Sequence, residues 1–231
     1  MNNQEKTPKS LTVYVGVKSD PIQYRYSFEW LFDLMAEENV FHLQLGSFTE
    51  LFFLSDSYFE KLRATAESRR ITISSVFTSH RELGGFLVED PEFARITMRN
   101  SRRLIEIAEI VGSPVAGSSM GGVYRDRLWY RQEGVRRYIE GMKELMHDAK
   151  EHGLSWLTVE PMSCYAEPPC HSQEMISLME EFRSYHAQNE DDTVQFGLCS
   201  DVLGGWSIFP GFISYYRPIK TCFPPPRSSA I

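Results

Sequence analysis

Two apolar runs that each end on an acid decide the fold of this chain: Leu154-Ser-Trp-Leu-Thr-Val-Glu160 and Val194-Gln-Phe-Gly-Leu-Cys-Ser-Asp201. An apolar run without polar alternation predicts a strand of a parallel sheet that is covered on both faces. In parallel barrels, functional side chains gather at the carboxyl ends of the strands. Two acids at the ends of successive strands therefore predict a shared divalent-metal site at the mouth of a barrel.

Four earlier apolar runs begin near residues 11, 40, 71 and 113, and each of the first five runs is followed by an amphipathic stretch. A repeat of roughly thirty to forty residues has the size of a βα unit. No GxGxxG follows the first run, which disfavours a dinucleotide-binding sheet. We therefore predict an α/β fold of the (β/α) TIM-barrel type with about six βα units.

Capping residues mark the ends of the predicted helices. Ser27 precedes a helix over residues 28–38, and Asp90-Pro91 suits an N-cap followed by proline at the first position of a helix over 92–111. Gly112 and Gly153 suit the left-handed positions that follow helices. Helices are thus expected between the strands, as a barrel requires.

The chain is predicted to have three parts. Residues 1–10 read as a disordered lead-in, residues 11–202 as the barrel domain, and residues 203–231 as an atypical proline-rich tail that contains no Asp, Glu or His. A full barrel usually needs about 250 residues, so we expect an incomplete one. Its first and sixth strands would have unpaired edges, which predicts a homo-oligomer.

Composition excludes several classes of function. A net charge of −7 and a pI near 5.4 disfavour a nucleic-acid surface, which is usually basic. The polar start lacks a signal-peptide core, and no apolar run approaches the eighteen or so residues that span a bilayer. Four cysteines without CxxC spacing favour reduced thiols. We expect a cytoplasmic protein that binds neither membrane nor nucleic acid.

Glu160 and Asp201 are the leading site residues. A lone carboxylate at the end of a buried strand is costly unless it is paired or bound to a metal, so Glu160 is predicted to be a metal ligand or catalytic base. A salt bridge at the strand end is the alternative for Glu160. For Asp201, the predicted role is metal ligand, and the alternative is a cap on the turn before Gly204-Gly205.

Further polar residues follow other strands. Gln44, near the end of the second strand, and His80, after the third, are predicted to contact substrate at the barrel mouth. Hydrogen bonding at the edge of the core is the alternative for Gln44. For His80, with Arg81 beside it, the alternative is a polar pair that fixes the turn at Gly84-Gly85.

Three segments together resemble the sugar isomerase/epimerase family of xylose isomerase-like barrels: Val159-Glu-Pro-Met162, Cys199-Ser-Asp-Val202 and Phe77-Thr-Ser-His-Arg-Glu-Leu-Gly-Gly85. The resemblance covers roughly residues 11–202 and rests on order and spacing. It implies that Glu160 and Asp201 bind Mn²⁺, Mg²⁺, Co²⁺ or Zn²⁺. It also implies that Glu167 hydrogen-bonds sugar hydroxyls, whereas exposure to solvent is the alternative for Glu167.

The resemblance implies a metal-dependent isomerase or epimerase of a small ketose or ketose phosphate, acting through an enediolate. The family supplies a further His and Glu after strands seven and eight, and no residue of this sequence corresponds to them. Two alternatives follow. One is a catalytically defective, truncated barrel that acts as a binding or partner subunit, and the other is a metal-dependent hydrolase of the same barrel group.

Overall fold

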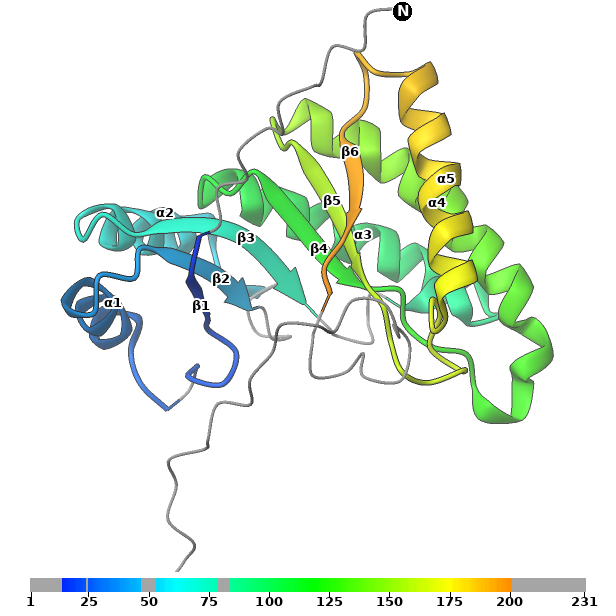
Figure 1. The fold of residues 1–231 in the computed structure, drawn as a ribbon, viewed down its shortest axis with the longest axis horizontal. Coiled ribbons are helices and arrows are strands. Elements are labelled where there is room, and N and C mark those ends of the chain that lie inside the picture. Colours follow the sequence, from blue (N-terminus) through cyan, green and yellow to red (C-terminus); the bar gives the residue numbers. More distant parts are fainter. Residues whose placement is uncertain (1–13, 24, 47–52, 79–83, 201–231) are drawn as a thin grey trace, which may run out of the picture.

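The computed structural model describes residues 14–23, 25–46, 53–78 and 84–200. Within them, six parallel strands lie side by side in the order of the sequence, with the helices along one face of the curled sheet (Figure 1). Each strand pairs in parallel with the one before it, which is the topology of a βα barrel. The predicted fold class is confirmed.

All six predicted strands and all five predicted helices are present. The strands are β1 (Gly16–Lys18), β2 (His42–Gly46), β3 (Thr72–Thr78), β4 (Val115–Ser119), β5 (Trp156–Glu160) and β6 (Gln195–Leu198). The helices are α1 (Phe28–Glu37), α2 (Asp56–Glu67), α3 (Pro91–Ile110), α4 (Arg131–Glu151) and α5 (Ser172–Gln188), with short 3₁₀ helices η3 (Gly85–Leu87) and η4 (Arg125–Tyr130). The predicted lead-in, residues 1–10, and tail, residues 203–231, lie outside the described residues.

The predicted caps are confirmed by hydrogen bonds. The Ser27 hydroxyl accepts from the backbone N–H of Trp30 at 3.2 Å, and the Asp90 carboxylate accepts from the N–H of Glu92 at 2.9 Å. Pro91 is the first residue of α3, where a missing N–H costs nothing. Gly112 and Gly153 have φ values of +72° and +73°, so the chain leaves α3 and α4 through the left-handed conformation.

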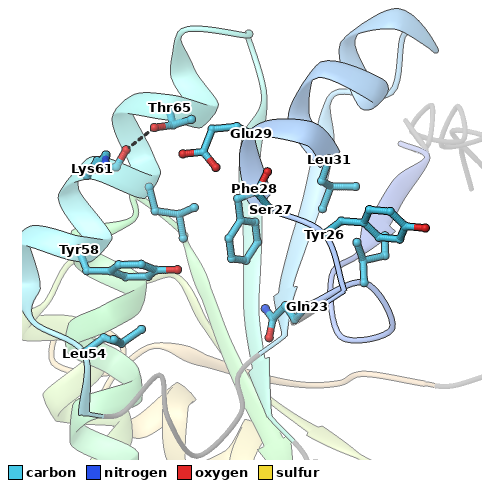
Figure 2. Close-up of a pocket in the computed structure, with 12 residues that line it drawn as sticks. Gln23, Tyr26, Ser27, Phe28, Glu29, Leu31, Leu54, Tyr58, Lys61 and Thr65 are labelled. Carbon is cyan, nitrogen blue, oxygen red and sulfur yellow. Dashed lines mark hydrogen bonds between the residues drawn. The ribbon is translucent and has the colours of Figure 1, made fainter.

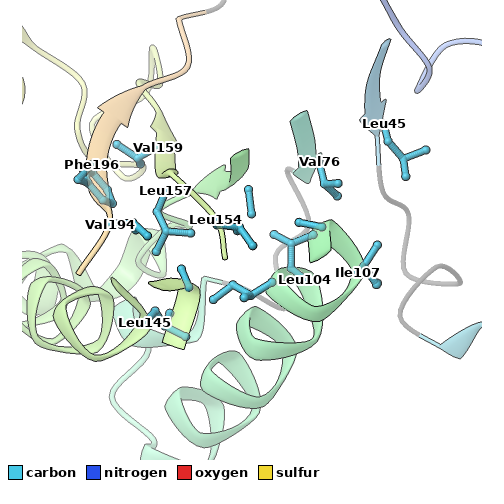
Figure 3. Close-up of a cluster of buried hydrophobic side chains, with 14 of the residues drawn as sticks. Leu45, Val76, Leu104, Ile107, Leu145, Leu154, Leu157, Val159, Val194 and Phe196 are labelled. Atoms are coloured by element: carbon cyan, nitrogen blue, oxygen red, sulfur yellow. The ribbon is translucent and has the colours of Figure 1, made fainter. Parts of the chain in front are cut away.

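The core lies between the outer face of the sheet and the helices. Leu157, Val159 and Phe196 of β5 and β6 belong to one buried cluster with Leu104 of α3 and Leu145 of α4 (Figure 3). Burying each such side chain contributes roughly 1.5–3 kcal/mol. This layer makes the strands and helices one body, so the positions of the strand ends are well defined.

The barrel is open in the described part of the chain. There, β1 and β6 each pair with one neighbour only, so each presents an unpaired edge. The register between β2 and β3 shifts by one residue after Leu43, because Ser74 is an extra residue in β3. Among the described residues, no helix is both long and apolar enough to cross a membrane.

Candidate active site

The face of the sheet opposite the helices is its inner face. On this face β4 packs closely against β3 and β5 at Gly117. A Cβ on Gly117 of β4 would lie 2.1 Å from Thr158 Oγ1 of β5 and 3.0 Å from Phe77 Cδ2 of β3. Leu157 and Val159 of β5 belong to the core on the opposite face. Because side chains alternate along a strand, Thr158 and Glu160 share the inner face.

Glu160 is the last residue of β5 and is half-buried. It is in register with Ser119, the last residue of β4. The structure thus places Glu160 at the carboxyl edge of the sheet, on the side that a barrel encloses. The carboxylate supplies hard oxygen donors, and such donors fit Mg²⁺ or Mn²⁺.

Gln44 also lies on the inner face, in β2, two residues before the last residue of that strand. The amide nitrogen Nε2 donates to Ser75 Oγ of β3 at 3.1 Å and lies 3.9 Å from the Sγ of Cys199, which follows β6. The backbone N–H of Cys199 donates to the carbonyl of Val159 at 2.9 Å, which holds the end of β6 beside β5. Side chains from β2 and from the end of β6 therefore meet across the interior.

Glu167 lies on the loop of residues 161–171 that joins β5 to α5. A Cβ on Gly122, after β4, would lie 2.9 Å from Glu167 Cγ. The N–H of Val123 donates to the carbonyl of Ala166 at 2.9 Å, so this loop is bound to the segment after β4. Glu167 is half-buried between the two loops, which excludes a fully solvent-facing side chain.

Arg131, the first residue of α4, anchors the same loop. Its side chain is only 8% exposed; the Nε donates to the carbonyl of Tyr165 at 2.8 Å, and the guanidinium forms an ion pair with Glu174 of α5. Burial would raise the pKa of Glu174, but hydrogen bonds from Arg131 and the Cys170 N–H, with the Arg131 charge, lower it below its usual value. Arg131 is therefore a structural partner of the loop that carries Glu167.

Three potential metal ligands meet at the start of α5. One ligand atom from each of Cys170, His171 and Glu174 lies within 4.8 Å of the others. However, Arg131 and the Cys170 N–H already bond the Glu174 carboxylate, and His171 Nδ1 accepts from the Glu174 N–H as the helix cap. The positive charge of the Arg131 guanidinium would repel a cation at this position, so we interpret the cluster as a helix cap.

A polar group at the end of β1 was not anticipated from the sequence. Lys18 pairs with Asp20 at 3.2 Å, with its Nζ 5.5 Å from the centre of the Phe77 ring on the inner face. Buried Ser19 accepts at 2.9 Å from both the Gly46 N–H and Gln23 Nε2, which locks the loop after β1 against β2. The only sequence signal was the charged stretch Lys18-Ser-Asp20 at the end of the first apolar run.

A cavity of about 430 Å³ lies between α1 and α2, outside the sheet (Figure 2). Phe28 and Tyr58 face one another across it, and Gln23 lies at the side nearest the strands. Of the predicted site residues that the structure describes, Gln44, Glu160 and Glu167 do not line it. The cavity belongs to the helical layer, so it is separate from the inner-face site.

Two predicted site residues, His80 and Asp201, lie outside the described residues. The structure therefore places Glu160 and Glu167 at the carboxyl end of the sheet and Gln44 on its inner face, and does not test the shared metal site of Glu160 and Asp201. The roles of all five residues remain predictions.

No family model and no curated protein matches the chain. Solved structures do match it. A xylose isomerase described as putative, from Rhodospirillum rubrum, is 19% identical with a TM-score of 0.70, over 82% of this chain and 66% of that chain. D-psicose 3-epimerase from Clostridium cellulolyticum H10 is 15% identical with a TM-score of 0.63, over 79% of this chain and 62% of that chain. A xylose isomerase-like TIM-barrel protein from Mycobacterium smegmatis, solved in complex with magnesium, is 16% identical with a TM-score of 0.50. The match covers 75% of this chain and 56% of that chain.

The chain has the fold of the xylose isomerase-like TIM barrels, and at the level of the fold the predicted resemblance is confirmed. It spans slightly less than two thirds of the length of the first two structures. One fold supports many reactions, so the fold by itself does not assign an activity.

Proposed function

We propose that this chain is a metal-dependent isomerase or epimerase of a small ketose or ketose phosphate. The observation that carries the proposal is Glu160, half-buried on the inner face at the carboxyl end of β5, in a fold shared with sugar isomerases and epimerases. Active sites of such barrels form at this edge.

Glu160 and Asp201 are the proposed ligands of the divalent metal, which would be Mn²⁺, Mg²⁺, Co²⁺ or Zn²⁺. When bound, the metal supplies Lewis-acid polarisation of the substrate carbonyl and its neighbouring hydroxyl. The magnesium in the Mycobacterium smegmatis protein supports a hard divalent ion for this fold. Gln44, His80 and Glu167 are the proposed contacts to sugar hydroxyls.

Glu160 is also the proposed base. Its carboxylate would remove the proton from the carbon next to the carbonyl, and the electron pair of that C–H bond would pass to the carbonyl oxygen, giving an enediolate. The abstracted proton stays on Glu160, so return of a different proton, from water, to the opposite face of the same carbon would invert that centre. Return of a proton to the neighbouring carbon moves the carbonyl and isomerises the sugar. Gln44 and Glu167 would hold the hydroxyls so that the proton leaves in line with the carboxylate.

A partner subunit without activity is the second candidate. The open edges of β1 and β6 in the described residues favour it, because an unpaired strand edge is a template for pairing with another chain. The two candidates differ in whether the chain alone converts a sugar.

The test is a direct assay of the full chain. The purified protein is freed of metal with a chelator, supplied with each of the four ions, and incubated with ketopentoses, ketohexoses and their phosphates. The proposal expects epimerised or isomerised product that depends on metal and is lost in Glu160→Gln. Folded, metal-loaded protein that converts none of the sugars would contradict the enzyme and favour the partner subunit.

A further inference from the structure

The end of β1 carries a charged pair that faces the inner side of the sheet. Lys18 is in register with Gln44 of β2, so the two side chains lie on the same, inner face. The Lys18 Nζ lies 5.5 Å from the centre of the Phe77 ring on that face and 3.2 Å from the Asp20 carboxylate. The Lys18–Asp20 pair therefore lies on the side of the candidate site and not in the outer helical layer.

Asp20 occupies space that β2 leaves empty at its last residue, Gly46. A Cβ on Gly46 would lie 1.1 Å from Asp20 Oδ1, so the carboxylate rests directly against the backbone of Gly46. Gly46 is two residues after Gln44, so its position belongs to the same inner face. The missing side chain at Gly46 thus admits a carboxylate to the inner face at the carboxyl end of the sheet.

Asp20 has an acceptor oxygen without a hydrogen bond. Asp20 Oδ1 is buried and accepts from no described residue, which is unfavourable for a carboxylate oxygen. The side chains of Lys18 and Asp20 are 43% and 28% exposed, so solvent and small ligands reach both. A hydroxyl group is both donor and acceptor, so a ligand with neighbouring hydroxyl groups can accept from the ammonium and donate to the carboxylate.

The loop that carries Asp20 is fixed before any ligand binds. Ser19 is fully buried; its backbone N–H donates to the carbonyl of Gln44 at 3.0 Å, and its hydroxyl accepts from the N–H of Gly46 at 2.9 Å. Gln23 Nε2 donates to the Ser19 hydroxyl at 2.9 Å and to the carbonyl of Gly46 at 2.7 Å. A donor and an acceptor held in place in this way lose little entropy on binding.

A contact across the interior relates the pair to Glu160. Gln44, the register partner of Lys18, lies 3.9 Å from the Sγ of Cys199, and the Cys199 N–H donates to the carbonyl of Val159, the residue before Glu160. The pair and Glu160 thus face the same interior, one from β1 and the other from β5. Three strands separate β1 from β5 in the sheet, so a ligand held at one end by Glu160 would present its other end toward β1.

We propose that Lys18 and Asp20 bind the hydroxyl groups of a ketose that are remote from its carbonyl, and so select sugars by chain length. The inference rests on the proposed function, in which Glu160 holds the carbonyl end. One hydroxyl group accepts from the Lys18 ammonium, and its neighbour donates to the Asp20 carboxylate. A ketohexose carries such hydroxyl groups, whereas a ketotetrose lacks the fifth and sixth carbon atoms. The pair determines specificity and takes no part in the proton transfer.

The affinity for two sugars of different length tests the proposal. The full chain, supplied with Mg²⁺, is titrated with D-fructose and with the ketotetrose D-erythrulose, and binding is followed by saturation-transfer NMR. Lys18→Met and Asp20→Asn should each weaken D-fructose binding about tenfold, as loss of a hydrogen bond to a charged group does, and leave D-erythrulose binding unchanged. Lys143→Met is the matched control, because Lys143 pairs with Glu181 and lies 5.0 Å from the centre of the Tyr185 ring in the outer layer. Circular dichroism confirms that each variant is folded.

This inference and the proposed function fail in different ways. Variants that bind D-fructose as tightly as the wild type would overturn the inference, and conversion of D-fructose by those variants at an unchanged KM would leave the proposed function intact. Variants that lose both sugars equally would also overturn it, because the pair would then only hold the loop. A chain that shows the expected preference but converts neither sugar would keep this binding pair and remove the proposed function. A wild type that binds neither sugar would overturn both.

Discussion

The amide nitrogen of Gln44 lies 3.9 Å from the sulfur of Cys199, although 155 positions separate the two residues in the sequence. Gln44 lies in the middle of β2 and Cys199 follows β6, so the contact spans the inner side of the sheet. A flat six-stranded sheet would hold the second and sixth strands about 19 Å apart, at about 4.8 Å between neighbours. The contact shows that the sheet is curled as a barrel even though its edges are open in the described part of the chain.

This curvature predicts a cross-link. In a chain whose other cysteines are replaced by serine, Gln44→Cys should be joined to Cys199 by a short bis-maleimide, and mass spectrometry of the digest should show the linked peptides. Glu29→Cys is the control, because Glu29 is exposed on α1 in the outer layer. Equal cross-linking of the two variants would contradict the contact between β2 and the segment after β6.

Close packing on the inner face predicts a stability difference between two glycines. Gly117→Ala would place its Cβ 2.1 Å from Thr158 Oγ1, so we expect a loss of about 1–3 kcal/mol in the free energy of unfolding. Gly197→Ala is the matched control on β6, where the nearest atom of Trp156 would be 3.3 Å away. Urea denaturation measures both. A Gly117→Ala variant as stable as the Gly197→Ala variant would show that β3, β4 and β5 pack less tightly.

The helices and strands could be predicted because residues close together in the sequence determine them. Ser27 and Asp90-Pro91 cap α1 and α3 as expected, since a cap forms between residues two or three apart. The bulge at Ser74 was not predicted, because an extra residue in β3 is visible only once β2 is placed beside it. An apolar run by itself does not indicate the register between neighbouring strands.

The candidate site was predictable only where a strand end marks it. Glu160 and Gln44 lie on the inner face, because the alternation along a strand fixes the side on which they point, and their roles stay predictions. Arg131 was missed as an anchor: its partners, Tyr165 and Glu174, are more than thirty residues away, and no local pattern links them. The Lys18–Asp20 pair was missed because each residue alone reads as surface charge.

The proposed roles of two glutamates predict different losses. Glu160→Gln should weaken Mn²⁺ binding, measured by calorimetry, because an amide is a poorer donor to a divalent cation than a carboxylate. Glu167→Gln should leave the Mn²⁺ affinity nearly unchanged and raise the KM for a sugar substrate, because its proposed partners are hydroxyl groups. If both variants lose the metal equally, Glu167 is a ligand and its assigned role is wrong. If neither does, Glu160 is not a ligand.

The ion pair between Arg131 and Glu174 predicts a pH dependence of stability. The pKa of Glu174 is lowered in the folded chain from its usual 4.5, so the pair stabilises the fold above that value. This contribution is lost as the pH falls through the lowered pKa, because the carboxyl group is then protonated in both states.

At pH 7, Glu174→Gln should lower the free energy of unfolding by about 1–3 kcal/mol, since the largely buried guanidinium loses its charged partner. Below pH 4.5 the difference from the wild type should shrink. Glu181→Gln is the control on the same helix, because Glu181 pairs with Lys143 at an exposed position and surface pairs contribute little. Urea denaturation at a series of pH values measures all three proteins. A Glu174→Gln difference that stays constant down to the acid limit would show that the carboxylate charge does not hold the loop.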